Sequence, residues 1–94
     1  MMNLYSYCPT IDLHGDDRDY ARIRINGFIA DNYKMKNSIV VIIHGNGEGI
    51  LKRTTQETLK RNKYVKSYKI DNFNPGMTIV EIKQKYWQNK TFDV

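Results

Sequence analysis

The chain has 94 residues, which suffices for one small domain with one hydrophobic core and leaves no room in these residues for a second. Fifteen Lys and Arg residues against 10 Asp and Glu residues give a net charge of +5, which favours polyanionic partners such as RNA, DNA or an anionic membrane. The single cysteine, Cys8, excludes an internal disulfide and is typical of a reducing cytosol.

No segment of the sequence predicts membrane insertion or export. The longest aliphatic run, 39–43, is far too short to cross a bilayer. The first ten residues lack the basic and apolar regions of a signal peptide. We therefore expect a cytoplasmic protein without a membrane partner.

The first half of the chain predicts a strand and a helix. Residues 1–9 lack periodicity and are interpreted as a lead-in, in which Cys8 packs as a small apolar side chain. Residues 10–14 (TIDLH) predict a short strand. A helix follows. Acidic residues at its start suit a helix N-terminus, and apolar residues then recur at helical spacing. These residues are Asp16, Asp17 and Asp19 at the start and Ala21, Ile25, Phe28, Ile29 and Met35 along the inner stripe.

The second half predicts a strand, a helix and a hairpin. Residues 38–44 (SIVVIIH) are β-branched and apolar on both faces, which is typical of a central strand. A second helix is expected over about 48–62. Residues 64–70 and 77–83 predict two strands that the turn 71–76 joins as an antiparallel hairpin, and 84–94 form a polar tail. The inner stripe expected for the second helix is Ile50, Leu51, Thr54, Thr58 and Leu59.

The order β-α-β-α-β-β predicts an α/β fold, here an α+β two-layer sandwich. We expect residues 10–83 to form a four-stranded mixed sheet with two helices on one face. A right-handed crossover makes the first two strands parallel, so both end at the same edge of the sheet. Ligands of open sheets collect at such an edge.

The same short motif closes both of those strands. IDLHG ends the first and VIIHG ends the second, so His14 and His44 are expected to come together. Asp12 lies two residues before His14 and faces the same side of the strand, away from Ile11 and Leu13. A single histidine is more often a satisfied surface imidazole, but the repeated corner favours chemistry. The three aspartates after Gly15 are interpreted as caps, and no metal site is predicted.

The glycines of the second corner favour a site that binds an anion. Gly45, Gly47 and Gly49 follow a strand and open a helix, where backbone N–H groups face outward. Their spacing matches neither the dinucleotide-binding nor the nucleoside-triphosphate motif, and plain turn chemistry is the alternative. Lys52 and Arg53, in the first turns of the helix, favour a phosphodiester.

Three motifs together resemble the small MutS-related (Smr) domain family. IDLHG, IIHGNGEGIL and GMTIVEIK stand in the order and at the separations of the family blocks L-D-L-H-G, H-G-x-G-x-G-x-L and G-x-T-x-V-x-L. The resemblance covers about 10–83 and implies a fold similar to the C-terminal domain of a bacterial translation initiation factor. Because these residues hold no ATPase or ubiquitin-binding domain, it implies a stand-alone form. The matching residues are Asp12, His14, Gly15, His44, Gly45, Gly47, Gly49, Gly76 and Thr78.

The resemblance also implies nucleic-acid binding and, in many members, endonuclease activity, some of it on messenger RNA at stalled ribosomes. Two departures concern the site: Asp16 stands where relatives often have an apolar residue, and only Gly76 stands where they often have a glycine-rich loop. The leading hypothesis is an endonuclease that cuts RNA, with His14 and His44 as base and acid and Asp12 orienting an imidazole. The phosphate contacts are expected from Gly15, Gly45, Gly47, Gly49, Lys52, Arg53, Gly76 and Thr78.

Three alternatives stay open at this point. The leading scheme requires no cofactor, whereas a metal-assisted variant would hold Mg²⁺ with Asp12 and Asp16. A second reading is a non-catalytic module that binds RNA, DNA or the ribosome. A third is a phosphate-bearing small molecule at the glycine corner. The module reading rests on Lys60, Arg61, Lys63, Lys66, Lys69, Lys83, Lys85 and Lys90, interleaved with Tyr64, Tyr68, Tyr86 and Trp87.

Overall fold

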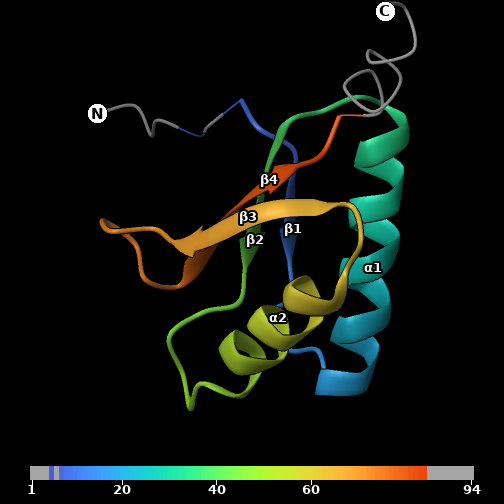
Figure 1. Ribbon diagram of the computed structural model, residues 1–94. Helices are drawn as coiled ribbons and strands as arrows, with labels where there is room; N and C mark the ends of the chain where they lie inside the picture. The colour runs from blue at the N-terminus through green and yellow to red at the C-terminus, as the bar shows by residue number, and fades with distance from the viewer. Residues whose placement is uncertain (1–4, 6, 85–94) are drawn as a thin grey trace, which may run out of the picture.

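The computed structural model describes residue 5 and residues 7–84, and it has the predicted order of elements (Figure 1). The features expected within 85–94, among them the aromatic residues of the tail, lie outside the described residues. The elements are β1 (Thr10–Asp12), α1 (Arg18–Lys34), β2 (Ile39–Ile43), α2 (Ile50–Arg61), β3 (Val65–Ile70) and β4 (Met77–Ile82).

The four strands form one mixed sheet in the order β1-β2-β4-β3. β1 runs parallel to β2, with Ile11 opposite Ile42, and β4 runs antiparallel to both β2 and β3. β2 therefore lies between two neighbours. Both of its faces are apolar because Val40 and Ile42 belong to one core cluster and Val41 belongs to another. The mixed four-stranded sheet that the sequence predicts is confirmed.

Both helices cover one face of the sheet (Figure 1). On the opposite face Tyr5 and Cys8 pack against a smaller cluster of Val41, Met77 and Ile79, so Cys8 has the apolar role predicted for it. The main core lies under the helices and comprises Ile11, Leu13, Ala21, Ile25, Ile29, Val40, Ile42, Leu59, Val80 and Ile82.

Helix α1 begins at a cap that the sequence predicts. The Asp17 carboxylate accepts the Tyr20 N–H at 2.8 Å, which satisfies one free N–H of the first turn. The helix runs through Asn26-Gly27 without a break, as expected. Met35 does not belong to the buried stripe: the helix ends one residue before it, and its side chain is 61% exposed.

Helix α2 begins later than the sequence predicts. Its N-cap is Gly49, so Ile50 is the first helical residue and its side chain is 54% exposed instead of buried. The buried stripe consists largely of threonines, with Thr55 added to the predicted positions. Ile50 therefore lies away from the core, whereas the next residue, Leu51, packs against it as predicted.

Candidate active site

The two His-Gly corners lie side by side at the carboxyl ends of β1 and β2. The parallel pairing continues one step past Asp12, because the Leu13 N–H donates to the Ile43 carbonyl at 2.8 Å. His44 follows directly on β2, and His14 follows Leu13 at the end of the parallel pairing. The prediction that both corners share one edge of the sheet is confirmed.

The two imidazoles nevertheless lie in different surroundings. His44 is 5% exposed and continues the face of Val40 and Ile42, which the helices cover. Asp12 lies on the opposite face, because its neighbours on β1 belong to the core under the helices. Two imidazoles that flank one phosphodiester therefore stay a prediction, in which one ring is exposed and the other is buried.

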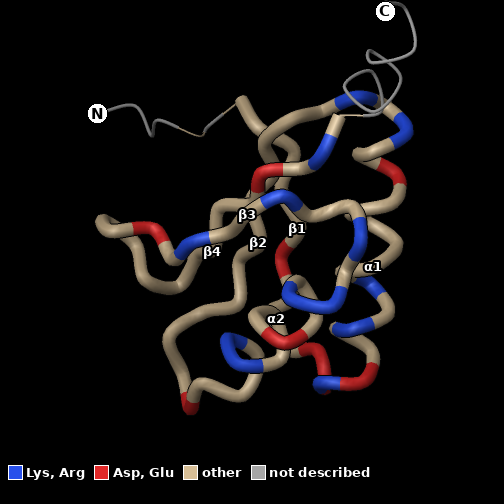
Figure 2. Tube along the Cα trace, in the orientation of Figure 1, with Lys and Arg blue, Asp and Glu red and all other residues tan. Residues whose placement is uncertain are grey.

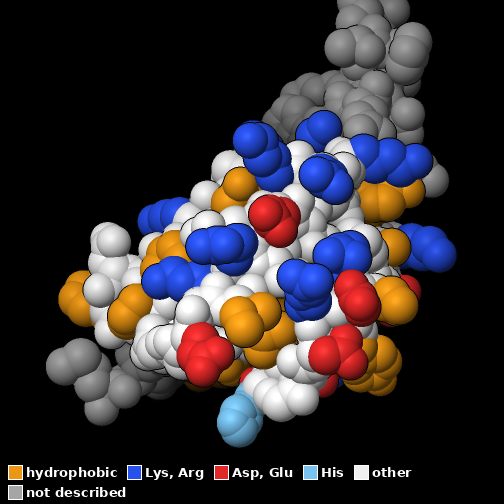
Figure 3. All heavy atoms as spheres, turned by 90° about the horizontal axis from the view of Figure 1, so that it is seen from below, with side chains coloured by type: hydrophobic (Ala, Val, Ile, Leu, Met, Phe, Trp, Pro, Cys, Tyr) orange, Lys and Arg blue, Asp and Glu red, His pale blue; other side chains and the backbone are white. Residues whose placement is uncertain are grey.

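His14 is exposed, and among the described residues its imidazole has no hydrogen-bond partner. Figure 3 shows one histidine side chain standing clear of the surface, which agrees with an exposed His14 and a buried His44. Both ring nitrogens of His14 are consequently open to a ligand.

Both ring nitrogens of His44 are occupied within the protein. A carbonyl oxygen only accepts, so Nδ1–H donates to the Gly45 carbonyl at 3.0 Å. In the neutral ring Nε2 then accepts the Thr78 hydroxyl at 2.8 Å. Burial lowers the pKa of His44, the bond to the Gly45 carbonyl works in the opposite direction, and the positive charge of Lys52 lowers the pKa further. Burial and the charge of Lys52 together favour a neutral imidazole.

The start of β4 supports this corner instead of contacting a ligand. Thr78 is fully buried, so its hydroxyl holds His44 and the phosphate contact expected from it is not available here. The buried Gly76 accepts the N–H groups of His44 and Gly45 through its carbonyl, at 2.9 and 3.0 Å. The third motif therefore fixes the second motif in place.

Asp12 shapes the first corner through the backbone. Its carboxylate accepts the backbone N–H of His14 at 2.9 Å, not an imidazole nitrogen as expected. Gly15 then takes a φ of +84°, a conformation that glycine adopts without strain. Together the two residues turn the chain so that the His14 side chain projects from the edge of the sheet.

The glycine loop lines a hollow of about 390 Å³ at the start of α2. Gly45 and Gly49 have φ values of +78° and +85°, and no side chain caps the helix at Gly49. Gly47 is exposed with open space above it. Lys52 lines this hollow, whereas Arg53 lines an adjoining groove between α1 and α2. The uncapped N–H groups and Lys52 favour an anion here, while Asp16, Asp17 and Glu48 also line the hollow and work against one.

Sequence reasoning missed the role of Arg24. Its guanidinium donates to the Asp16 carboxylate at 2.7 Å and to the Asp12 carbonyl at 3.1 Å. The unusual Asp16 is thereby paired and does not add an isolated negative charge beside His14. Eight residues separate the two partners, and Asp16 precedes the helix, so no helical i,i+4 pattern indicates the pair. In the described part of the chain, no three His, Cys, Asp or Glu side chains group as metal ligands.

A family model describes most of the chain. The Smr domain model matches residues 11–83. The chain belongs to the Smr domain family. It is 36% identical over 85 residues to a protein named Endonuclease MutS2 from Clostridium acetobutylicum, and 38% identical over 76 residues to one from Clostridium botulinum (strain Eklund 17B / Type B). These matches cover 87% and 78% of this chain, but only 11% and 10% of the relatives, so the chain spans about a tenth of their length.

Two solved structures share the fold. The Smr domain of Thermus thermophilus MutS2 aligns with a TM-score of 0.77 and 24% identity, over 80% of this chain and 98% of that one. YdaL, a stand-alone small MutS-related protein from Escherichia coli, aligns with a TM-score of 0.75 and 19% identity, over 80% and 64% of the two chains. Neither helix in the described residues has the length and apolar character that a membrane crossing requires.

Proposed function

We propose that this Smr domain is a nucleic-acid-binding endonuclease that cuts RNA and uses His14 as its acid–base group. The observation that carries the proposal is an exposed imidazole with two open nitrogens, which follows the strand paired with the one that leads into a glycine loop suited to phosphate. Relatives that are 36–38% identical bear the name endonuclease, which supports the reaction class.

The proposed reaction is an internal transesterification. His14 removes the proton of a ribose 2′-hydroxyl, the 2′-oxygen attacks phosphorus, and the bond from phosphorus to the 5′-oxygen breaks. The imidazolium returns its proton to the leaving 5′-oxygen, and a 2′,3′-cyclic phosphate remains. Backbone N–H groups at Gly47 and Gly49, with Lys52, stabilise the charge that builds on phosphorus. DNA lacks the hydroxyl and is not a substrate in this scheme.

Asp12 and His44 act as positioning residues in this proposal. Asp12 holds the backbone of His14, and His44 holds the glycine loop against β4 through the carbonyl of Gly76 and the hydroxyl of Thr78. His44 has no free nitrogen in this conformation, so it serves the loop geometry and does not transfer the proton.

Cleavage assays test the proposal directly. Purified protein is incubated with labelled single-stranded RNA, duplex RNA and DNA, with and without EDTA. We expect cutting of RNA in EDTA with cyclic phosphate ends, and a loss of about 10²- to 10⁴-fold in His14→Ala. Full activity of His14→Ala overturns the mechanism. Cutting of both RNA and DNA that requires Mg²⁺ favours the metal-assisted variant with Asp12 and Asp16 instead.

A non-catalytic binding module is the second candidate. Seven Lys and Arg residues and one acidic residue, Glu57, lie between Lys52 and Lys69, along α2 and β3 (Figure 2). Base stacking by Tyr64 is less favoured than the sequence suggests, because its ring already stacks on Tyr33 at a centroid distance of 4.2 Å. Protein that binds RNA but never cuts it under any metal condition supports this candidate. Cosedimentation with ribosomes tests a ribosomal partner.

A further inference from the structure

The arginines of this chain gather in one groove. Four of the five arginines line the groove between α1 and α2, but none of the eight lysines among the described residues does. Charge alone would not separate the two residue types. Arginine differs by its planar guanidinium, which donates two parallel hydrogen bonds to a phosphate group. The groove arginines are Arg18, Arg22, Arg53 and Arg61.

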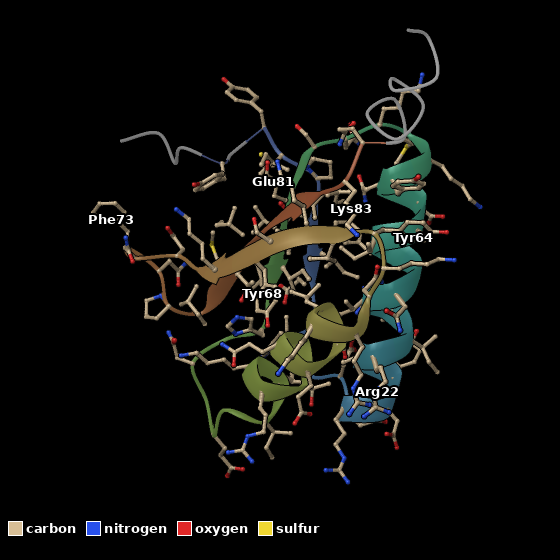
Figure 4. The ribbon with its side chains drawn as sticks, viewed as in Figure 1. Arg22, Tyr64, Tyr68, Phe73, Glu81 and Lys83 are labelled. Atoms are coloured by element: carbon tan, nitrogen blue, oxygen red, sulfur yellow. The ribbon has the colours of Figure 1, made fainter. Side chains whose placement is uncertain are left out.

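The groove continues from the candidate active site. It consists of two hollows of about 290 and 330 Å³ that share Arg22 and Glu57. The first hollow also shares Arg18 and Gly49 with the hollow at the glycine loop. Arg22 lies near the start of α1, next to α2 (Figure 4). The twelve residues of α2 are about 18 Å long, so the groove is long enough for several consecutive phosphates.

The guanidinium groups are available to a ligand. Among the described residues, no carboxylate lies within ion-pair distance of Arg18, Arg53 or Arg61. Arg22 pairs with Asp19 at 3.3 Å, where both side chains are more than half exposed, and such a pair contributes little. Two glutamates, Glu48 and Glu57, line the groove and offset half of its positive charge. Binding would therefore depend on guanidinium hydrogen bonds as well as on net charge.

We propose that this groove binds the phosphate backbone of an RNA strand on one side of the bond that is cut. The inference rests on the proposed function for the identity of the strand. The substrate is then an oligonucleotide that extends several nucleotides beyond the cleavage site. A mononucleotide reaches only the glycine loop and binds weakly.

The test measures binding of a fluorescent 12-nucleotide RNA, blocked against cleavage by 2′-O-methyl groups, to the full chain by anisotropy at several salt concentrations. We expect Arg22→Ala and Arg61→Ala each to weaken binding about three- to tenfold and to reduce the salt slope by about 0.7, the value for one phosphate contact on a single strand. Lys34→Ala is the matched control, because Lys34 is exposed in the last turn of α1, outside the groove, and its removal takes away the same charge. We expect less than a twofold change there.

Two further variants sharpen the result. Arg61→Lys keeps the positive charge but loses the planar guanidinium and its two parallel hydrogen bonds. It should therefore keep the salt slope and still lose affinity. Lys60→Ala removes the neighbouring charge on α2. An equal loss in Lys60→Ala and Arg61→Ala overturns the groove in favour of general surface charge. Thermal unfolding of each variant shows that the fold is intact.

Different results would contradict the groove proposal and the proposed function. Arginine variants that bind like the wild type overturn the groove, while a cleavage defect in His14→Ala still supports the function. Conversely, a fully active His14→Ala overturns the mechanism and leaves the groove intact if the arginine variants bind weakly. A wild-type chain that binds no oligonucleotide overturns both.

Discussion

The two His-Gly corners have the same sequence pattern and opposite surroundings. His14 follows a three-residue strand at the edge of the sheet and is exposed, whereas His44 follows a central strand and is buried. Both ring nitrogens of His44 are occupied by Gly45 and Thr78, and those of His14 have no partner among the described residues. A repeated motif can therefore leave one imidazole open to a ligand and hold the other within the protein.

The largest expected contrast is in stability. His44→Ala opens a cavity and leaves the buried Thr78 hydroxyl unpaired, so we expect the free energy of unfolding to fall by about 2–4 kcal/mol. His14→Ala should change it by less than about 0.5 kcal/mol, because the side chain is exposed. Urea denaturation measures both variants. Equal losses would show that the two corners are structurally equivalent after all.

Buried threonines give the next contrast. Thr78→Val removes the donor to Nε2 of His44 and should cost about 1–3 kcal/mol, because a buried nitrogen is left unsatisfied. Thr55 is also fully buried, but among the described residues its hydroxyl has no partner. Thr55→Val should therefore be neutral or stabilising, as measured by thermal unfolding. A similar cost for both variants would mean that the bond to His44 contributes nothing.

The glycines after the histidines should behave alike. Gly15 and Gly45 have φ values of +84° and +78°, and an added Cβ meets no atom within 4 Å at either position. Gly15→Ala and Gly45→Ala should each cost about 1 kcal/mol, from backbone conformation alone. Chemical denaturation measures both. A much larger loss at Gly45 would show that the glycine loop is more tightly packed than the spacing around it indicates.

The smallest expected effect is on the pH dependence of stability. The folded chain holds the pKa of His44 below its ordinary value of 6.5, so the unfolded chain takes up this proton first. The stabilisation from neutral His44 is complete above pH 6.5 and is lost as the pH falls through the lower pKa of the folded state. We expect a shallower decline between pH 7.5 and 5 in His44→Gln than in the wild type. Unchanged curves would contradict the pKa shift.

The sequence predicts the elements and the shared edge because those follow from local patterns. Period-two and helical spacing indicate the strands and helices, and the parallel crossover brings the two corners together. The sequence does not predict the face of the sheet on which His44 lies. SIVVIIH is apolar on both faces, so its pattern does not show which face of the sheet His44 takes. The register of β2 with β4 places His44 beside Thr78.

The remaining errors arise from tertiary contacts and helix ends. Gly76 and Thr78 match a family motif, but only the register of β4 shows that they face His44 instead of a ligand. Met35 and Ile50 stay in phase with their helical stripes and are exposed because each lies at a helix terminus. A periodic pattern does not show at which residue a helix starts or stops.

The position of β1 in the sheet has a consequence for local opening. β1 has three residues and a single neighbouring strand, whereas β2 and β4 each have two neighbours. Segments with few pairing partners open at lower free energy than the whole domain unfolds. Amide hydrogens of β1 should accordingly exchange with solvent before those of β4. Mild denaturant would then detach the strand that precedes His14, and with it any catalytic activity, while the rest of the sheet is still folded.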